Sequence, residues 1–265
     1  MKVAVATAAL LLPAAAWAQD EGPRFCPNRP SLESSACTTE PGRVHVEFSV
    51  ADWTLDDDAG ERNDTILGGD FLARLGVGSS TEVQLAWTPV AYARTRDKAT
   101  GAVSRVARPG DARLAVRQNL ANPDGSGLSY GLEPFVTLPV GRSPVGAGTW
   151  GAGVVLPVTY DVSDTVNVGF TGELDAAPDD DGRGRHLQYS GVAATSLQLT
   201  RALSLTVEGE LLRDRDPTGH ETQALAGLGM LWKYSRTRAF YAEAIGGLNG
   251  ASPDVQLYAG VAALF

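Results

Sequence analysis

The sequence contains few of the residues from which disulfide folds, metal enzymes and nucleic-acid-binding surfaces are built. Its 2 cysteines are too few for a disulfide-built fold or a four-thiolate zinc site. With 3 histidines, a catalytic metal centre with several imidazole ligands is nearly excluded. Acidic residues outnumber basic ones by 31 to 22, so the chain lacks the basic surface that a nucleic-acid partner requires. We therefore expect no metal, no cofactor and no nucleic-acid partner.

Long apolar runs are absent except at the N-terminus. The run at 3–12 follows a single lysine and leads to Ala16 and Ala18, small side chains that fit the pocket of a signal peptidase. We predict that residues 1–18 are a cleaved signal peptide and that the mature chain begins at Gln19. No later stretch approaches the roughly 18 to 20 apolar residues that a membrane helix requires, so no α-helical anchor is expected.

Both cysteines lie in a proline- and serine-rich segment directly after this leader. Because an exported chain reaches an oxidising compartment, Cys26 and Cys37 are predicted to form a disulfide, worth about 3 kcal/mol of loop-closure entropy. The alternative is two free thiols in a floppy arm, and neither alternative makes them catalytic. We predict that residues 19–42 form an N-terminal periplasmic segment.

The rest of the chain, residues 43–265, alternates between apolar and polar residues with a period of two, which is typical of β-strands. Long and short connections alternate between the strands. This asymmetry, the even strand number and the apolar-out, polar-in pattern predict an all-β fold, a transmembrane antiparallel β-barrel of about 12 up-and-down strands. The expected strands lie at residues 44–50, 70–77, 82–87, 111–117, 129–138, 150–158, 166–173, 188–198, 203–211, 224–232, 240–246 and 255–265.

A soluble β-sandwich would show the same alternation, but its strands usually have about five to six residues and its outer face carries charge. Here the strands are longer and the outward set is almost free of charge. The acidic runs at 56–58 and 179–181 are predicted to be solvated loop tips rather than a calcium site, because their spacing lacks the pattern of a dedicated cage. Aromatic residues near strand ends fit a membrane-interface belt: Trp53 and Trp150 on the long-loop side, and Tyr160, Trp232, Tyr234 and Phe240 on the short-turn side.

The C-terminal strand ends in Phe265 with apolar residues at every second position before it, which resembles the insertion signal read by the barrel-assembly machinery; Tyr258 and Phe265 are its candidate residues. Together with the segments PGDARLAVR at 109–117 and TLPVG at 137–141, the chain from about Pro41 onward resembles the family described as putative MetA-pathway of phenol degradation. The resemblance implies a transporter-like barrel in the bacterial outer membrane, surrounded by outer-membrane lipid and lipopolysaccharide.

Charged side chains on the inward face are the candidate functional residues. Arg113 and Arg117 lie on one strand, with Glu82 and Glu133 on its neighbours. Such a set is either a paired network that braces the wall or a constriction that selects solutes, and both alternatives stay open. Acids outnumber bases, which disfavours anions. The full set is Asp70, Arg74, Glu82, Asp111, Arg113, Arg117, Glu133, Glu173, Glu208, Glu210 and Glu243.

The inward set also includes apolar positions that either pack the interior or favour aromatic or lipophilic solutes: Phe135, Val155, Leu212, Leu225, Leu231 and Ile245. Twelve strands enclose less than a general porin does, so we expect a narrow or gated path and passive or binding-assisted uptake of small, aromatic or hydrophobic solutes. One alternative is a lipase-like barrel enzyme using His186 or His220 beside Ser190 and Glu221. Because a lone histidine in a loop is more often solvated than catalytic, we predict no catalytic residue. The other alternative is a purely structural barrel.

Overall fold

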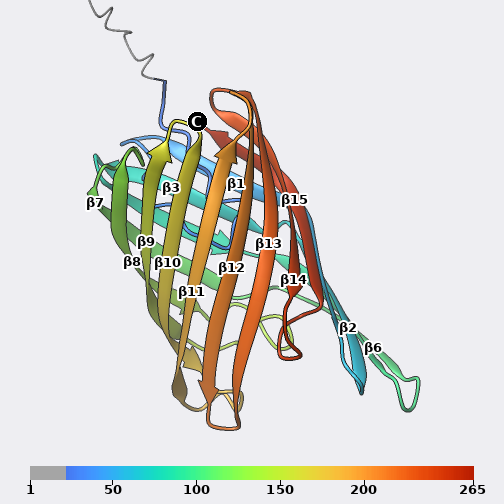
Figure 1. Cartoon of the computed structure of the whole chain (residues 1–265). Helices are drawn as coiled ribbons and strands as arrows, with labels where there is room; N and C mark the ends of the chain where they lie inside the picture. Colours follow the sequence, from blue (N-terminus) through green and yellow to red (C-terminus); the bar gives the residue numbers. More distant parts are fainter. Residues whose placement is uncertain (1–21) are drawn as a thin grey trace, which may run out of the picture.

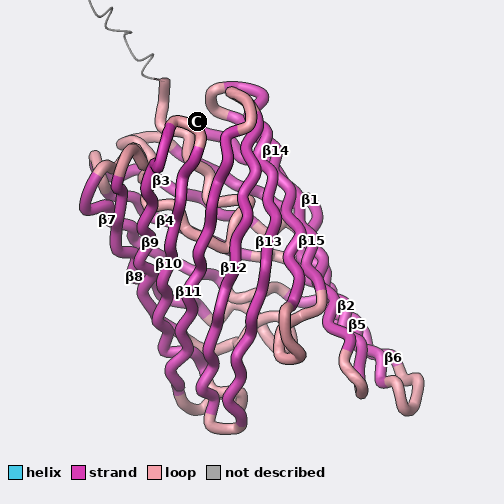
Figure 2. Tube along the Cα trace, in the orientation of Figure 1, coloured by secondary structure: helices cyan, strands magenta, loops and turns pink. Residues whose placement is uncertain are grey.

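The computed structural model describes residues 22–265, and all of their regular structure is β-strand. Residues 22–265 contain no helix that is long and apolar enough to cross a membrane. Figures 1 and 2 show the strands as the wall of one tall barrel. The strands are β1 (Val44–Asp57), β2 (Glu61–Gly68), β3 (Phe71–Gly78), β4 (Thr81–Trp87), β5 (Val90–Asp97), β6 (Val103–Arg108), β7 (Ala112–Ala121), β8 (Leu128–Leu138), β9 (Gly151–Ser163), β10 (Val166–Pro178), β11 (Arg185–Gln198), β12 (Leu203–Asp216), β13 (Gly219–Ser235), β14 (Arg238–Gly247) and β15 (Val255–Leu264).

Twelve of these strands close into a single antiparallel barrel in the order β1-β3-β4-β7-β8-β9-β10-β11-β12-β13-β14-β15. Closure is made by β15 pairing with β1, where His45 lies opposite Leu264 and Phe48 opposite Val261. Closure leaves no free edge along this part of the wall, the condition under which a sheet can lie in hydrocarbon. The prediction of a twelve-stranded barrel is confirmed, and each expected segment is a strand.

The other three strands, β2, β5 and β6, extend the long-loop end beyond the closed wall. They continue β3, β4 and β7 across short breaks, and together with the end of β1 they form a sheet that projects at the lower right of Figure 1. The sequence predicts long loops at 54–63 and 95–108, and these predictions are wrong in part. Charged residues hide the strand pattern there, although they pair with one another. Asp64 lies 3.1 Å from Arg94 on the neighbouring strand and 3.0 Å from Arg62 on its own strand.

The outer face of the barrel is apolar and the inner face is charged, the reverse of a soluble protein. Val50, Phe170 and Leu211 expose 68%, 53% and 63% of their surface on the outside, whereas Arg74 and Glu82 are fully buried inside. Trp150 and Trp232 also face outward near strand ends. This exterior suits a lipid environment, and the chain is a β-barrel of the outer-membrane type.

The N-terminal segment lies inside the barrel rather than beside it. Residues 22–42 enter at the end where the C-terminus lies (Figure 1) and contact the inner wall on several strands. The predicted disulfide between Cys26 and Cys37 is confirmed, with the two Cα atoms 6.3 Å apart. We call residues 22–42 the plug. The predicted signal peptide and the predicted cleavage point lie outside the described residues.

Candidate functional site: the lumen and its plug

Carboxylates of the wall hold the plug by accepting hydrogen bonds from its backbone. The Glu47 carboxylate on β1 accepts from the amides of Asn28 (3.0 Å) and Arg29 (2.7 Å). On the opposite side, the Glu208 carboxylate on β12 accepts from the Leu32 amide at 2.8 Å. A plug without regular structure has many unpaired amides, and charged acceptors satisfy them with bonds stronger than neutral ones. The wall acids therefore replace the ladder partners that the plug lacks.

Arginines of the wall satisfy the carbonyl groups of the plug in the same way. Arg74 on β3 donates to the Cys26 carbonyl at 2.5 Å. Arg117 on β7 donates to the Cys37 carbonyl (3.3 Å) and to the Ser34 hydroxyl (3.2 Å). The Cys26 and Cys37 carbonyls thus each accept a hydrogen bond from a wall arginine, and the disulfide between the two cysteines limits their separation. Both arginines are predicted site residues, and their contact with the plug could not be predicted.

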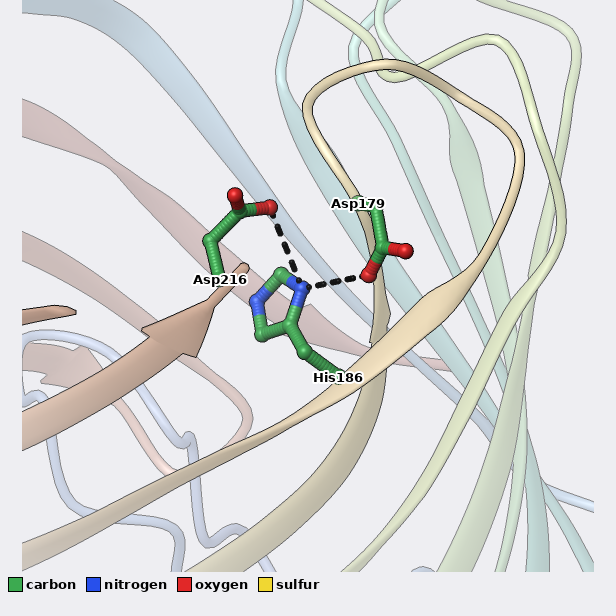
Figure 3. A group of neighbouring side chains, drawn as sticks. All are labelled: Asp179, His186 and Asp216. Carbon is green, nitrogen blue, oxygen red and sulfur yellow. Dashed lines mark hydrogen bonds and ion pairs between the residues drawn. The ribbon is translucent and has the colours of Figure 1, made fainter. Parts of the chain in front are cut away.

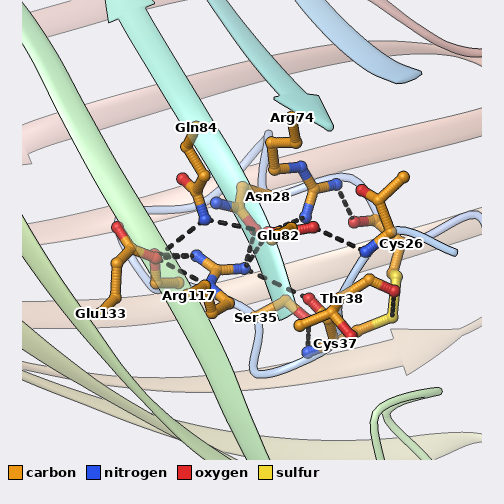
Figure 4. Close-up of polar contacts among 12 residues, drawn as sticks. Cys26, Asn28, Ser35, Cys37, Thr38, Arg74, Glu82, Gln84, Arg117 and Glu133 are labelled. Atoms are coloured by element: carbon orange, nitrogen blue, oxygen red, sulfur yellow. Dashed lines mark hydrogen bonds and ion pairs between the residues drawn. A yellow bond between two sulfur atoms is a disulfide. The ribbon is translucent and has the colours of Figure 1, made fainter. Parts of the chain in front are cut away.

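The same two arginines form a buried ion network with three acids, of which Figure 4 labels Glu82 and Glu133. Arg74 lies 3.4 Å from Glu47 and 3.6 Å from Glu82, and Arg117 lies 3.5 Å from Glu82 and 2.6 Å from Glu133. These side chains are at most 5% exposed. Charges so deeply buried require partners with good geometry, and the plug completes the set because the Thr39 amide donates to Glu82 at 2.6 Å. The network braces the wall and holds the plug at once.

Three further predicted residues, Asp70, Arg113 and Glu173, form two other ion pairs. Arg113 is 32% exposed, lies 3.2 Å from Glu173 and stacks over the Phe135 ring at 3.5 Å. Asp70 lies 2.5 Å from Arg29 of the plug. Arg29 also donates to Ser49 of the wall at 2.6 Å and is thereby held on two sides.

Four predicted residues lie apart from this network. Asp111 accepts from the amides of Gly141 and Gly148, at 2.7 and 3.0 Å, and so holds the β8–β9 loop rather than joining Arg113 and Arg117. Glu210 is half-buried on β12 and makes no ion pair with any residue in 22–265. The last two, Glu243 and Tyr258, bond to each other across the lumen face of β14 and β15, with the Tyr258 hydroxyl donating.

The two residues proposed as an assembly signal point in opposite directions. Tyr258 faces the lumen, whereas Phe265 is 66% exposed on the outside. Only Phe265 therefore lies on the outward face with Leu257, which is also exposed. A role of these residues in assembly stays a prediction.

Two cavities lie on opposite sides of the plug. One of about 340 Å³ opens toward the short-turn end and includes Thr159, Ser204 and Lys233 of the wall. The other, of about 290 Å³, lies toward the long-loop end and includes Arg113 and Glu173. The plug residues that line both cavities, and so separate them, are Asn28, Arg29, Ser31 and Glu33.

Some of the predicted apolar lumen residues fill space rather than line a path. Phe135 and Val155 are buried and pack with Ala115 as a small core. Ile245 is also buried, at 3% exposure. Leu231 is different, because it lines the cavity at the short-turn end. Interior packing therefore accounts for three of the six residues, and Leu212 and Leu225 are half-buried.

Inward glycines make room for the plug where it touches the wall. A Cβ added at Gly76 would lie 2.0 Å from the Glu40 carbonyl oxygen, and one at Gly229 would lie 3.1 Å from Pro30. Pro41 also bridges to Gly76 directly. No rotation of a side chain can relieve the overlap at Gly76, because the obstacle is backbone.

We therefore expect Gly76→Ala to loosen the plug without opening the barrel. Relieving the overlap should cost on the order of 1–3 kcal/mol and expose the plug to protease. Limited trypsin digestion should cleave after Arg24 about tenfold faster than in the unaltered protein, an effect equivalent to roughly 1.4 kcal/mol. Gly250→Ala is the matched control, because nothing lies within 4 Å of a Cβ there. Equal cleavage rates in both variants would contradict this role of Gly76.

The residues of the hydrolase alternative do not assemble. No hydrogen bond joins His186 or His220 to a serine within the described chain.

At the acidic loop tip 56–58, amide hydrogen bonds from Glu61 and Gly60 lower the pKa of Asp58. Asp57 pairs with Lys98 at 2.6 Å, so this run shapes a turn and an ion pair.

Comparison with known proteins agrees with this architecture. The sequence model of the family described as "Putative MetA-pathway of phenol degradation" matches residues 27–265, which confirms the resemblance seen in the sequence. The fold is similar to that of the COG4313 outer membrane channel from Pseudomonas putida F1, with a TM-score of 0.68 and 11% identity over 86% of this chain and 97% of that chain. No curated protein matches the chain.

Two other solved structures share the fold more distantly. The KdgM porin gives a TM-score of 0.51 at 9% identity, over 84% of this chain and 99% of that chain. The transport unit of the autotransporter AIDA-I from Escherichia coli gives a TM-score of 0.51 at 9% identity, over 91% and 92%. These neighbours are a channel, a porin and a transport unit rather than enzymes.

Proposed function

The chain belongs to the family described as "Putative MetA-pathway of phenol degradation", and from that premise we propose that it is a plugged channel for uptake of small aromatic or hydrophobic solutes. The observation that carries the proposal is the pair of cavities separated by four plug residues. Each cavity opens toward one end of a barrel that lies in the bacterial outer membrane. Displacement of the plug joins them into one path.

The charge of the lumen supports a neutral or cationic solute. The acids Glu47, Glu208 and Glu243 face the interior together with the ion network, so acids remain in excess there. Anions are repelled by such a lumen. A neutral phenol-like solute meets no such barrier and finds hydroxyl and carboxylate groups to bond its own hydroxyl. The proposal needs no cofactor, no energy source and no catalytic residue.

The surroundings of the barrel follow from its outer face. We infer that outer-membrane lipid and lipopolysaccharide cover the apolar exterior, with residues such as Phe170 and Leu211 in the hydrocarbon. We infer also that the barrel-assembly machinery recognises the last strand, which ends in an exposed Phe265.

The proposal is tested by solute entry into proteoliposomes that hold the full mature chain. We expect faster entry of labelled phenolic solutes than into protein-free liposomes, and slower entry of anionic benzoate-like analogues of the same size. Equal rates with and without protein, both for the unaltered chain and for a chain lacking the plug, would contradict a channel. That outcome would favour a purely structural barrel.

Removing the disulfide is expected to increase channel opening. In Cys26→Ala/Cys37→Ala the undocked plug gains chain entropy of about 3 kcal/mol, so docking becomes weaker. The wall contacts of the plug stay the same, because both cysteine carbonyls remain. Planar-bilayer recordings should show openings at least about tenfold more often than in the unaltered protein. Adding reductant to the unaltered protein should reproduce the change, and adding it to the double variant should have no effect. If neither the double substitution nor the reductant makes the unaltered channel open more often, the role of the disulfide is refuted.

A further inference from the structure

A second polar cluster lies at the long-loop end, and none of its residues lines either of the two cavities beside the plug. Asp179 follows β10, His186 lies near the start of β11 and Asp216 ends β12 (Figure 3). The His186 Nδ1 atom is 3.0 Å from Asp179 Oδ1 and 3.3 Å from Asp216 Oδ2. One possible ligand atom from each of the three side chains lies within 4.8 Å of the other two.

The backbone holds these groups in place. Gly182 has a φ of +71°, and its amide bonds to the Asp179 carbonyl to close the turn between β10 and β11. A Cβ added at Gly184 would lie 2.0 Å from Asp179 Oδ2. The Asp179 carboxylate thus lies directly over Gly184. The Asp180 amide donates to Asp216 Oδ2 at 2.8 Å and ties the turn to the end of β12.

The His186 imidazole has more carboxylate neighbours than it has N–H groups to donate. Asp214 Oδ1 lies 2.9 Å from Nε2, which makes three carboxylates around one ring. The His186 side chain is 6% exposed, and its Nε2 atom is buried without a hydrogen bond. A single Nδ1–H can serve only one of the two carboxylates beside it. No lysine or arginine forms an ion pair with these acids anywhere in residues 22–265.

We propose that Asp179, His186 and Asp216 bind a divalent transition metal ion of the Zn²⁺ class. Ligand atoms at about 2.0 Å from a tetrahedral ion lie about 3.3 Å apart, close to the separations observed here. One imidazole nitrogen together with carboxylate oxygens is a donor set that suits Zn²⁺. It does not suit Ca²⁺, which prefers oxygen ligands only. The fourth position is open to water.

The remaining acid fits the same scheme. When the metal binds His186 Nδ1, the neutral ring carries its single proton on Nε2. The Nε2 atom lies 2.9 Å from Asp214, and Asp214 is itself held by a hydrogen bond from Gln188 Nε2 at 2.9 Å. A carboxylate that orients a metal-binding histidine is a recurrent feature of zinc sites. Asp214 is therefore a positioning residue, and the ion joins the β10–β11 turn to the end of β12.

The test is calorimetric titration of the tag-free, chelator-treated mature protein in detergent with Zn²⁺ alone, and in parallel with Ca²⁺. We expect one Zn²⁺ per chain. His186→Ala and Asp216→Asn should each weaken binding about 100-fold or more, and Asp214→Asn about 10-fold. His220→Ala and Asp181→Asn, which change a histidine and an acid outside the cluster, should bind as the unaltered protein does.

Three outcomes would overturn the proposal. These are no Zn²⁺ binding, Zn²⁺ binding that survives His186→Ala, and Ca²⁺ binding as strong as that of Zn²⁺. Folding of each variant is checked by its heat-dependent mobility on gels. If His186→Ala does not fold, Asp179→Asn and Asp216→Asn decide the result together with the melting temperature, which Zn²⁺ should raise in the unaltered protein only. Because none of these residues lines the two cavities beside the plug, failure of this proposal would leave the proposed channel untouched.

Discussion

Deletion of residues 22–40 is expected to raise the single-channel conductance by about tenfold or more, since a twelve-stranded barrel without its filling is wide enough for a continuous water path. The plug lies between the two cavities, and its residues Asn28, Arg29, Ser31 and Glu33 line both of them. Their removal joins about 340 Å³ and about 290 Å³ of space and adds the volume of the plug itself. Planar-bilayer recording of the refolded deletion variant measures the effect.

The barrel should still close without the plug, because β1 pairs directly with β15 through residues such as His45 and Leu264. Glu47 and Glu208 lose their amide partners but gain water, so they are not left unpaired in a dry interior. The control is the double cysteine variant, which keeps the plug and should open more often to the same conductance. A deletion variant that is folded by its heat-dependent mobility but conducts no better would contradict the proposal that the plug closes the channel.

The wall was predictable from the sequence because each of its strands obeys one simple constraint. A residue that faces lipid is apolar and its neighbour that faces the lumen is polar, so alternation at positions such as Phe48 and Ser49 predicts the strand and its orientation. The projecting strands β2, β5 and β6 were not predictable, since both faces of that sheet are polar. There the pairing of Asp64 with Arg94 replaces the apolar signal.

The plug was not predictable from its own residues, because a segment without regular structure has no periodicity. The sequence evidence for the plug lies in the residues of the wall instead. Glu47, Glu82 and Glu208 are acids on an enclosed face, and the arginines of the wall supply partners for only some of them. Such an excess requires donors from outside the wall, and the amides of the plug are those donors. Asp111 shows the limit of this reasoning, because an acid on the same strand as Arg113 binds loop amides instead.

Replacing Arg117 with alanine is expected to lower the free energy of unfolding by about 3–5 kcal/mol, because it leaves buried acids without a partner. Arg117 is fully buried, lies between Glu82 and Glu133, and donates to the plug at the Cys37 carbonyl. The truncation therefore removes two ion pairs and three hydrogen bonds to the plug, at Asn28, Ser34 and Cys37. The variant should unfold at lower urea concentration and at lower temperature, and its channel should open more often.

Arg113→Ala is the matched comparison, since Arg113 lies on the same strand and also pairs with acids, yet is 32% exposed to the lumen. Its pairing with Glu173 is screened by water, so its loss should cost about 1 kcal/mol or less. Its guanidinium borders the cavity at the long-loop end, so the variant should instead increase the preference of the open channel for cations. If both variants lose equal stability and neither alters the currents, the wall charges only brace the barrel. If stability falls only in Arg117→Ala and selectivity changes only in Arg113→Ala, the buried pair holds the plug while the exposed pair selects the solute.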